Sequence, residues 1–213
     1  MPELWTFFVV TFVSIFTMID PLGNIPVFIA LTDGLSPRDV RRVAFRAILT
    51  AIVILVLFQF AGQAIFSLFH ISSNSLQIVG GVIFFVTGYE MLQARITRSL
   101  HDNGPSDQQY ANDIAITPLG IPMICGPGAI TTVIIRMAEA ETSLKQGLLL
   151  LTIVLALGIT FVMLIGAKSI LRFLGESGNK VLLRLMGLIV MAIAVELFFS
   201  GLTPYVKAMV AKG

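Results

Sequence analysis

The stretch DPLGNIP, residues 20–26, interrupts a long apolar segment, and a shortened copy of it, PLGIP, recurs at residues 118–122. A helix in hydrocarbon pairs all of its own backbone groups, whereas clustered prolines and glycines leave N–H and C=O groups without partners where there is no water. Such a break is tolerated where the backbone lines a cavity. One break in each half of a chain is typical of a binding site between the structural repeats of a transporter.

The composition predicts an integral membrane protein. Hydrophobic residues make up 56% of the 213 residues, charged residues make up 12%, and the mean hydropathy is +0.94, so polar residues are too few to cover a soluble core. The expected partner is the lipid bilayer. A net charge of +2 without a basic face of the kind that nucleic acid requires argues against a nucleic-acid partner. Because one crossing takes roughly 20 residues, we expect about six transmembrane helices, at the apolar runs 4–31, 43–69, 76–94, 114–138, 146–173 and 181–200.

The chain divides into two halves with matching features. Residues 1–97 and 114–213 each hold three predicted helices, and residues 98–113 form a polar linker. Gly81 and Glu90 of the first half are matched by Gly187 and Glu196 of the second, in the same order as the broken motifs. Because three is an odd number, the second half must enter the membrane from the opposite side. We therefore expect an all-α membrane protein with six transmembrane helices as two inverted three-helix repeats, in which helices one and four are broken.

The distribution of lysine and arginine predicts the orientation in the membrane. The loops after helices one, three and five carry ten of these residues, against four on the opposite side. Cytoplasmic loops are enriched in lysine and arginine, so both termini are expected outside the cytoplasm. Four of the ten are the arginines of residues 38–46, which follow the helix-starting pair Ser36 and Pro37. Their role is either to set the topology or to contact lipid.

Each break should end one half-helix and begin another. We expect the first pause at residues 20–24, with Pro26 in the first turn of the new half-helix. At the second break, Gly126, Pro127 and Gly128 should restart the helix in the same way. A restarted helix presents free N–H groups and a partial positive charge, which favour an anionic group such as a substrate carboxylate. The candidate binding residues are Asp20, Pro21, Gly23, Asn24, Pro26, Pro118, Gly120, Pro122, Cys125, Gly126, Pro127, Gly128, Thr131 and Thr132.

Three acids are candidates for coupling to an ion. Asp20 lies at the first break, where a buried carboxylate is costly unless it binds a cation, a proton or a substrate amine. The alternative is that Asp20 caps the new half-helix near Gly23. Glu90 and Glu196 lie near the ends of helices three and six. Interfacial pairing with arginine is the simpler role for these two glutamates, and proton coupling is the other.

Glycines and glutamines inside the predicted helices indicate contacts between helices. We expect the glycines at 80, 81, 88, 158 and 166 to let neighbouring helices approach closely. Gln59 and Gln63 lie four residues apart on one face of helix two. They are expected to bridge helices, with lining of a cavity as the alternative.

The residue pattern of an enzyme is missing, so we expect no catalytic residue. His70 and His101 fall in loops far from other ligand residues, and no metal site is expected. The single cysteine, Cys125, has no histidine at membrane depth to activate it. Without a phosphate-binding loop we expect no cofactor, and transport would draw on a proton or sodium gradient or on a partner subunit. The alternatives are a non-transporting assembly or sensor protein and an exporter of other small metabolites, and a homo-oligomer is left open.

The motifs DPLGNIPVF at 20–28, PLGIPMICGPGAITT at 118–132 and LMGLIVM at 185–191 resemble those of the MarC family of bacterial and archaeal membrane proteins, and the likeness covers essentially the whole chain. Within that family, the SnatA-like members are similar to transporters of small neutral amino acids such as glycine and alanine. The resemblance implies a six-helix protein of the inner (cytoplasmic) membrane, whose termini would then be periplasmic. It also implies a site for a small zwitterionic substrate at residues 20–26 and 118–132. The second motif differs at one position, where Thr117 replaces the acid.

Overall fold

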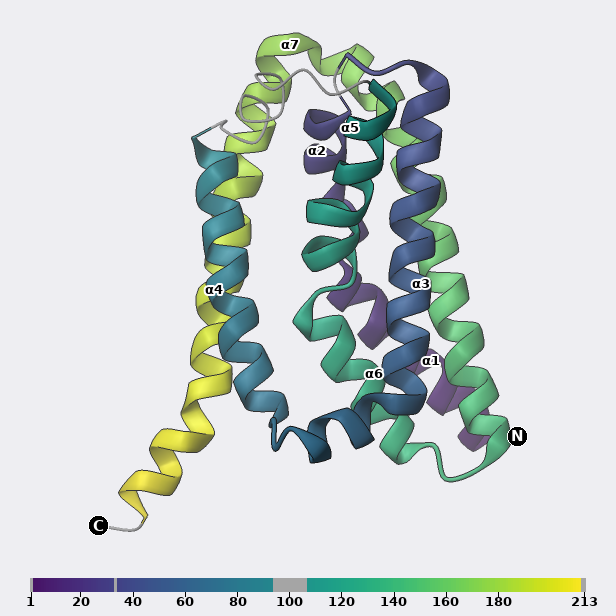
Figure 1. The fold of residues 1–213 in the computed structure, drawn as a ribbon, viewed down its shortest axis with the longest axis vertical. Helices are drawn as coiled ribbons and strands as arrows, with labels where there is room; N and C mark the ends of the chain where they lie inside the picture. The colour runs from purple at the N-terminus through teal and green to yellow at the C-terminus, as the bar shows by residue number, and fades with distance from the viewer. Residues whose placement is uncertain (1, 33, 94–106, 212–213) are drawn as a thin grey trace.

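The computed structural model describes residues 2–32, 34–93 and 107–211, and within these ranges every regular element is a helix (Figure 1). The last element reverses direction between Ala167 and Arg184, so it forms two antiparallel spans. The elements in chain order are α1 (Pro2–Ile19), α2 (Pro21–Leu31), α3 (Pro37–Leu68), α4 (Ser73–Leu92), α5 (Asp107–Ile114), the π-helical η1 (Ala115–Ile124), α6 (Pro127–Glu139) and α7 (Ser143–Val210).

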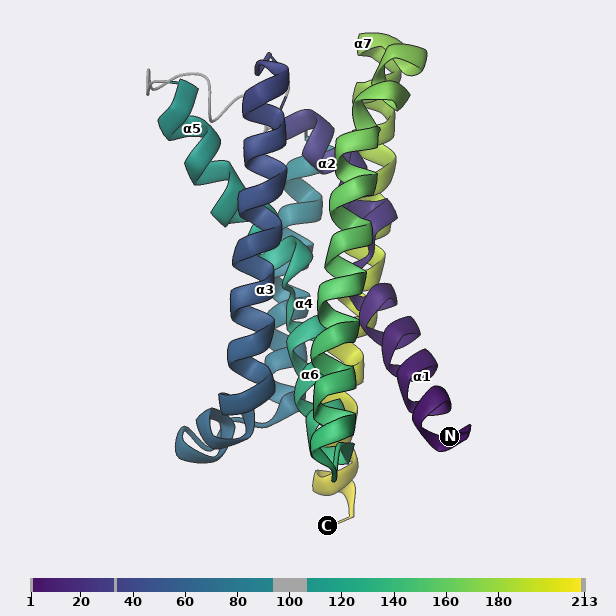
Figure 2. The ribbon, with the colours of Figure 1, turned by 90° about the vertical axis from the view of Figure 1, so that its right-hand side faces the viewer.

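The chain is an all-α integral membrane protein, as its composition predicted. The pair Ala111–Ile124 and Pro127–Glu139 is bent by 58°. Because α5, η1 and α6 together run the length of the bundle in two views, we count the pair as one broken span (Figures 1 and 2). Both termini lie at the same end, which an even number of crossings requires (Figure 1). The other helices long and apolar enough to cross a membrane are Glu3–Ile29, Pro37–Leu68, Ser73–Leu92, Ser143–Ala167 and Arg184–Val210.

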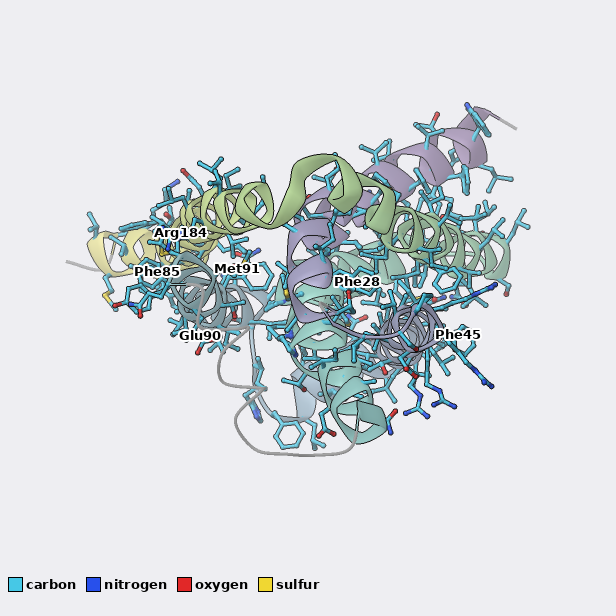
Figure 3. All side chains as sticks on the ribbon, turned by 90° about the horizontal axis from the view of Figure 1, so that it is seen from above. Phe28, Phe45, Phe85, Glu90, Met91 and Arg184 are labelled. Carbon is cyan, nitrogen blue, oxygen red and sulfur yellow. The ribbon has the colours of Figure 1, made fainter. Side chains whose placement is uncertain are left out.

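The broken spans lie between two groups of unbroken helices. α4 and the second span of α7 form one group, and α3 with the first span of α7 stands on the other side of α2, η1 and α6 (Figure 1). α1 leans outward from the bundle toward the N-terminus (Figure 2). Seen from above, the fully buried Phe28 of α2 marks the centre (Figure 3). The broken spans are thus flanked by protein on two sides, while Thr117 and Ile121 of the second break are exposed.

α4 and the second span of α7 pack backbone against backbone. A Cβ atom added at Gly88 would lie 2.8 Å from the Gly187 carbonyl oxygen, and one added at Gly187 would lie 2.7 Å from the Gly88 carbonyl oxygen. Seven residues earlier on α4, a Cβ at Gly81 would lie 2.7 Å from the Ala194 carbonyl oxygen. If Gly81 of the first half corresponds to Gly187 of the second, then Gly88 corresponds to Ala194. Exchanging the two halves then turns the contact between Gly88 and Gly187 into the contact between Gly81 and Ala194, as a two-fold relation between repeats requires. The repeat itself stays a prediction.

The predicted packing role of the glycines is correct on α4 and wrong on α7. On α4, Gly80, Gly81 and Gly88 all lie against neighbouring helices. A Cβ atom added at Gly80 would lie 2.3 Å from Pro127 Cγ. Gly158 and Gly166 are exposed, and a Cβ at either would meet nothing within 4 Å. The first span of α7 is apolar on all sides, so its sequence does not indicate which face contacts protein.

The second half-helix of the first span begins earlier than predicted. α2 starts at Pro21, and Pro26 lies inside it rather than in its first turn. Asp20 adopts a left-handed backbone conformation that turns the chain within one residue. The fixed φ of Pro21 then suits the first helical position, so no longer pause is needed.

The predicted linker is shorter than its polarity indicated. Residues 107–113 belong to α5 and begin the fourth span. Ala111, Ile114 and Ala115 recur at helical spacing and are buried. This apolar stripe holds the otherwise polar segment against the bundle. Residues 98–106 of the predicted linker lie outside the described residues.

Candidate binding site at the helix breaks

Asp20 forms the first break by itself. Its backbone is left-handed, with φ 46° and ψ 67°, which aspartate tolerates better than most residues because its short side chain bonds to nearby backbone. Its Oδ1 accepts a hydrogen bond from the Gly23 N–H at 3.1 Å and caps α2, as one of our two predictions had it. Gly23 allows this geometry because a Cβ there would lie 2.2 Å from Asp20 Oδ2. No further hydrogen bond to this carboxylate comes from the described residues, so Oδ2 remains for a ligand.

Asn24 pairs the backbone that the first break exposes. Its side chain is buried, and its Nδ2 donates to the carbonyl oxygens of Ile19 at 2.7 Å and Asp20 at 3.1 Å. A buried carbonyl without a partner would destabilise the fold. Asn24 therefore uses its two amide hydrogens to hold the break in shape.

The second break is longer than the first. η1 contains two residues with extended backbone, Thr117 (φ −133°, ψ 123°) and Ile121 (φ −131°, ψ 127°). Each precedes a proline, whose ring disfavours the helical conformation in the residue before it. The Cys125 N–H donates to the Gly120 carbonyl oxygen at 2.9 Å, which closes a wide turn. The irregular segment predicted at residues 118–127 is confirmed.

α6 begins without a side-chain cap. Gly126 is its N-cap residue and Pro127 its first helical residue, as predicted. The first intrahelical bond runs from the Ile130 N–H to the Gly126 carbonyl oxygen at 3.0 Å. The N–H groups of Gly128 and Ala129 precede that bond and have no partner inside the helix. Such a helix start carries a partial positive charge and favours an anion.

A cavity of about 400 Å³ adjoins both breaks. Its volume is within the range of small-molecule sites. Asp20 of the first break and Gly128 of the second share it with residues of α4 and the second span of α7. It is lined by Thr17, Met18, Ile19, Asp20, Gly23, Asn24, Phe84, Thr87, Met123, Gly128, Val190, Ile193 and Leu197.

The cavity brings together part of the predicted set of binding residues: Asp20, Gly23, Asn24 and Gly128. Cys125 is 1% exposed and does not line the cavity. The remaining members of the set also lie outside the lining and belong to the two breaks and to α6, and they are Pro21, Pro26, Pro118, Gly120, Pro122, Gly126, Pro127, Thr131 and Thr132.

Two threonines follow the start of α6. Thr132 Oγ1 donates to the Gly128 carbonyl oxygen at 2.8 Å, so it bonds back to its own helix. Thr131 is buried, and its Oγ1 has no hydrogen-bond partner among the described residues. A buried hydroxyl without a partner is costly. Its hydrogen is therefore free to bond a water molecule or a ligand.

Glu90 and Glu196 lie apart from the cavity. Both side chains are exposed, and from above Glu90 lies on the side of α4 away from the centre marked by Phe28 (Figure 3). Among the described residues, Asp20 is the acid that lines the cavity. The same part of the chain holds no group of three or more His, Cys, Asp or Glu that could bind a metal ion.

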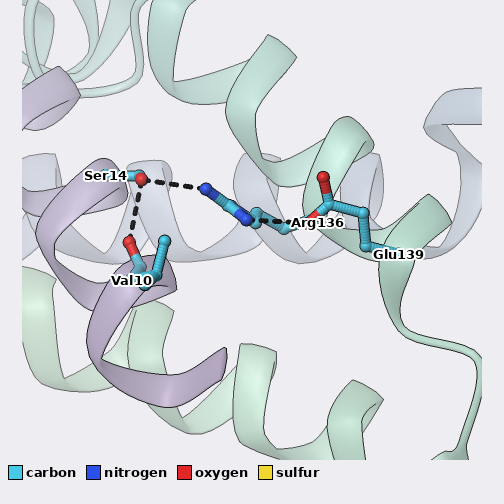
Figure 4. Close-up of polar contacts among 4 residues, drawn as sticks. All are labelled: Val10, Ser14, Arg136 and Glu139. Carbon is cyan, nitrogen blue, oxygen red and sulfur yellow. Dashed lines mark hydrogen bonds and ion pairs between the residues drawn. The ribbon is translucent and has the colours of Figure 1, made fainter. Parts of the chain in front are cut away.

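Arg136 ties α6 to α1 on the terminal side of the bundle (Figure 4). Its Nη2 donates to Ser14 Oγ at 3.2 Å, and its Nη1 pairs with Glu139 at 2.7 Å. Further along the same two helices, Met18 and Gly128 line the cavity. The Arg136 contact therefore joins the two helices that carry these cavity residues.

Our sequence reasoning missed the apolar wall of the cavity. Phe84 and Thr87 come from α4, and Val190 and Ile193 come from the second span of α7. An apolar residue in an apolar helix carries no local signal of a cavity. The signal available in the sequence was the position of these residues relative to the glycines that pack α4 against α7. Phe84 and Thr87 lie between Gly81 and Gly88 on α4, and Val190 follows Gly187 on α7.

Comparison with known proteins identifies the family. The chain matches the description "MarC family integral membrane protein" over residues 5–206. It is 35% identical to a UPF0056 membrane protein of Methanocaldococcus jannaschii, over 92% of this chain and 96% of the relative. It is 33% identical to the UPF0056 membrane protein YvbG of Bacillus subtilis, over 93% and 95% of the two chains.

A further relative is the UPF0056 inner membrane protein YhgN of Escherichia coli, which is 30% identical over 92% of this chain and 95% of its own length. No solved structure matches the chain. The family match extends over both breaks and over all or nearly all of each span described above. The chain belongs to the MarC family of integral membrane proteins.

Proposed function

We propose that this protein is a secondary transporter of small solutes, and that small neutral amino acids are its substrates. The observation that carries the proposal is the cavity that the Asp20 carboxylate shares with the uncapped start of α6. The ammonium group of a zwitterion requires a negative partner, which Asp20 Oδ2 supplies. Its carboxylate requires donors, which the start of α6 at Gly128 supplies. The resemblance to SnatA-like proteins supports the same class of substrate.

The remaining walls favour a small, uncharged side chain. Phe84, Val190, Ile193 and Leu197 are apolar. No basic side chain of the described residues lines the cavity, and its acid is already assigned to the ammonium group. A substrate with a charged side chain would leave that charge unpaired among mostly apolar walls, which is costly. The volume of about 400 Å³ is near the lower end for small-molecule sites.

A proton or sodium gradient would drive this transport. A coupling cation needs an oxygen ligand at membrane depth. Asp20 Oδ2 meets this need, and Glu90 and Glu196 are exposed on the outer surface instead. We assign coupling to Asp20, which would exchange the cation for the substrate ammonium group. The protein would act in the cytoplasmic membrane without catalysing a reaction, and its termini would be periplasmic.

Uptake into liposomes tests the proposal. Purified protein is reconstituted, and entry of labelled glycine and alanine is measured with an imposed proton or sodium gradient and without one. Asp20→Asn keeps the size and the capping oxygen but loses the charge, so it should abolish gradient-driven uptake while unfolding at nearly the parent temperature. Asp20→Ala should also lose about 1 kcal/mol of stability, as the cap is removed.

The control is Asp113→Asn, which makes the same chemical change at an exposed site on α5. It should transport like the parent. Normal uptake by Asp20→Asn would remove Asp20 from the mechanism. If neither amino acid is taken up and neither raises the unfolding temperature, the amino-acid proposal fails. A sensor or assembly protein, or an exporter of other metabolites, would then be the better account.

A further inference from the structure

Four arginines occupy one face of α3 near its start. Arg38, Arg41, Arg42 and Arg46 follow the spacing of three and four residues that aligns side chains along a helix. All four are exposed. We call these residues the arginine face. Such a concentration of positive charge on one helix attracts anionic partners.

The acid in the same turn is already occupied. α3 begins at Pro37, and the Ser36 hydroxyl accepts a hydrogen bond from the Asp39 N–H at 3.2 Å, as the predicted helix start requires. The same hydroxyl donates to the Asp39 carboxylate. Asp39 therefore completes the capping of the helix and makes no ion pair with an arginine among the described residues.

No carboxylate of the described residues neutralises the arginine face. Among all the described residues, the ion pairs join Arg136 to Glu139 and Lys145 to Glu3, and none of these residues belongs to the arginine face. Arg46 donates to the side-chain oxygen of Asn112 on α5, which is a neutral group. The Arg46 guanidinium is thus held in place, and no acid of the described residues compensates its charge.

The length of α3 carries the arginine face out of the hydrocarbon, from the level of the lipid headgroups outward. α3 has 32 residues, so it is about 48 Å long at 1.5 Å per residue. A hydrocarbon layer of about 30 Å takes roughly 20 of these residues. Counted back from the end of the helix at Leu68, the layer begins near Leu49. Residues 37–48 then extend beyond the hydrocarbon, on the side predicted to be cytoplasmic. Arg46 lies at headgroup depth, and the long side chains of Arg41 and Arg42 can reach back to it.

The same helix face continues into the membrane as an apolar stripe. Leu49, Val53 and Leu57 are 47%, 60% and 52% exposed. Phe45, 55% exposed, lies among the arginines and packs edge-on against Phe161 of α7, with ring centroids 6.4 Å apart. Seen from above, Phe45 lies on the outer side of the bundle, where nitrogen-bearing side chains extend outward beside it (Figure 3). One surface thus offers cations at headgroup depth and apolar side chains at acyl-chain depth.

We propose that the arginine face binds an anionic phospholipid, with its phosphate among the guanidinium groups and an acyl chain along the stripe from Leu49 to Leu57. Guanidinium groups bind phosphate oxygens in pairs of parallel hydrogen bonds. Basic clusters next to a transmembrane helix attract anionic lipids, with a contribution from each residue. The inference is independent of the transported substrate, because the arginine face and the cavity have no residue in common.

Lipid titration of the purified protein tests the proposal. The parent protein in neutral detergent is titrated with phosphatidylglycerol, and with phosphatidylcholine of the same acyl chains, while the unfolding temperature is recorded. Phosphatidylglycerol should stabilise the parent at lower concentration than phosphatidylcholine, and added salt should reduce the difference. Arg41→Gln/Arg42→Gln should weaken the phosphatidylglycerol effect about 30-fold, at roughly fivefold for each arginine. Work in detergent avoids any change of membrane orientation caused by lost charges.

Two controls separate the headgroup site from general charge. Lys207→Gln/Lys212→Gln removes two cations at the C-terminal end and should leave the lipid preference unchanged. Arg41→Lys/Arg42→Lys keeps the charge but loses the paired guanidinium hydrogen bonds, so it should retain only part of the preference. Equal stabilisation by the two lipids, or an equal loss in the two glutamine variants, would overturn the proposal. Stabilisation of the same size by glycerol phosphate alone would assign the face to a soluble phosphate instead and overturn it as well.

Discussion

A methyl group added at Gly88 should force α4 away from the second span of α7. Its carbon would lie 2.8 Å from the Gly187 carbonyl oxygen, 2.8 Å from Met191 Cγ and 3.0 Å from Met191 N. Two of these three atoms belong to the backbone of the facing helix, which cannot change rotamer to make room. The helices must therefore separate or the methyl group must remain overpacked.

The size of this effect follows from comparison with Gly158→Ala. Alanine in place of a helical glycine gains about 1 kcal/mol of helix propensity, and this gain is common to both variants. At Gly158 nothing lies within 4 Å of the added carbon, so the alanine variant should show the full gain in helix stability. At Gly88 overpacking opposes it by about 1–3 kcal/mol. Gly88→Ala should therefore be less stable than Gly158→Ala by about 1–3 kcal/mol.

Unfolding of the purified variants in mixed detergent micelles, followed by circular dichroism, measures the difference. Gly187→Ala should resemble Gly88→Ala because the contact is reciprocal. The double variant should cost less than the sum of the two single variants, since a separation forced by one methyl group also makes room for the other. A Gly88→Ala protein as stable as Gly158→Ala would refute the close backbone contact.

Other predictions concern the site and the orientation. Gly23→Ala would put a carbon 2.2 Å from Asp20 Oδ2, so it should disturb the cap, cost about 1 kcal/mol in chemical unfolding and reduce uptake; parent-like uptake would contradict the geometry of the break. A small thiol reagent should modify Thr87→Cys, made in a Cys125→Ser background, many times faster than it modifies Cys125 in the parent, because Thr87 lines the cavity and Cys125 is 1% exposed; equal rates would argue against this cavity. Reporter fusions should place both termini outside the cytoplasm, and cytoplasmic activity at either end would reverse the orientation.

The breaks are predictable from sequence because proline and glycine act on their own neighbours. The conformation of Thr117 follows from the ring of the next residue, whatever the rest of the fold does. The first break was also predicted in the correct motif, although it is confined to Asp20 rather than extending over residues 20–24. The predicted role of Pro26 as the start of the new half-helix was wrong. Pro21 and Pro26 both suit a helix start, and the sequence does not show that Asp20 turns the chain directly before Pro21.

Side-chain direction is the part of the structure that the sequence does not contain. Gly88 and Gly158 both lie in apolar helices, and one meets a facing backbone while the other meets nothing. The contact depends on how whole helices are placed, which is a long-range property. For the same reason Phe84 and Val190 gave no sign that they line a cavity, whereas Asp20, the polar residue at a break, did.

The two breaks differ in a way that suits a zwitterion. The first contains an acid that caps α2 with one oxygen and keeps the other free. The second has Thr117 at the matching position, and α6 begins at Gly126 with no side-chain cap. A capping acid at Gly126 would occupy the free N–H groups and place a second negative charge near Asp20, so a substrate carboxylate would be repelled. The uncapped start of α6 thus leaves one break negative and the other positive, as the proposed binding of an amino acid requires.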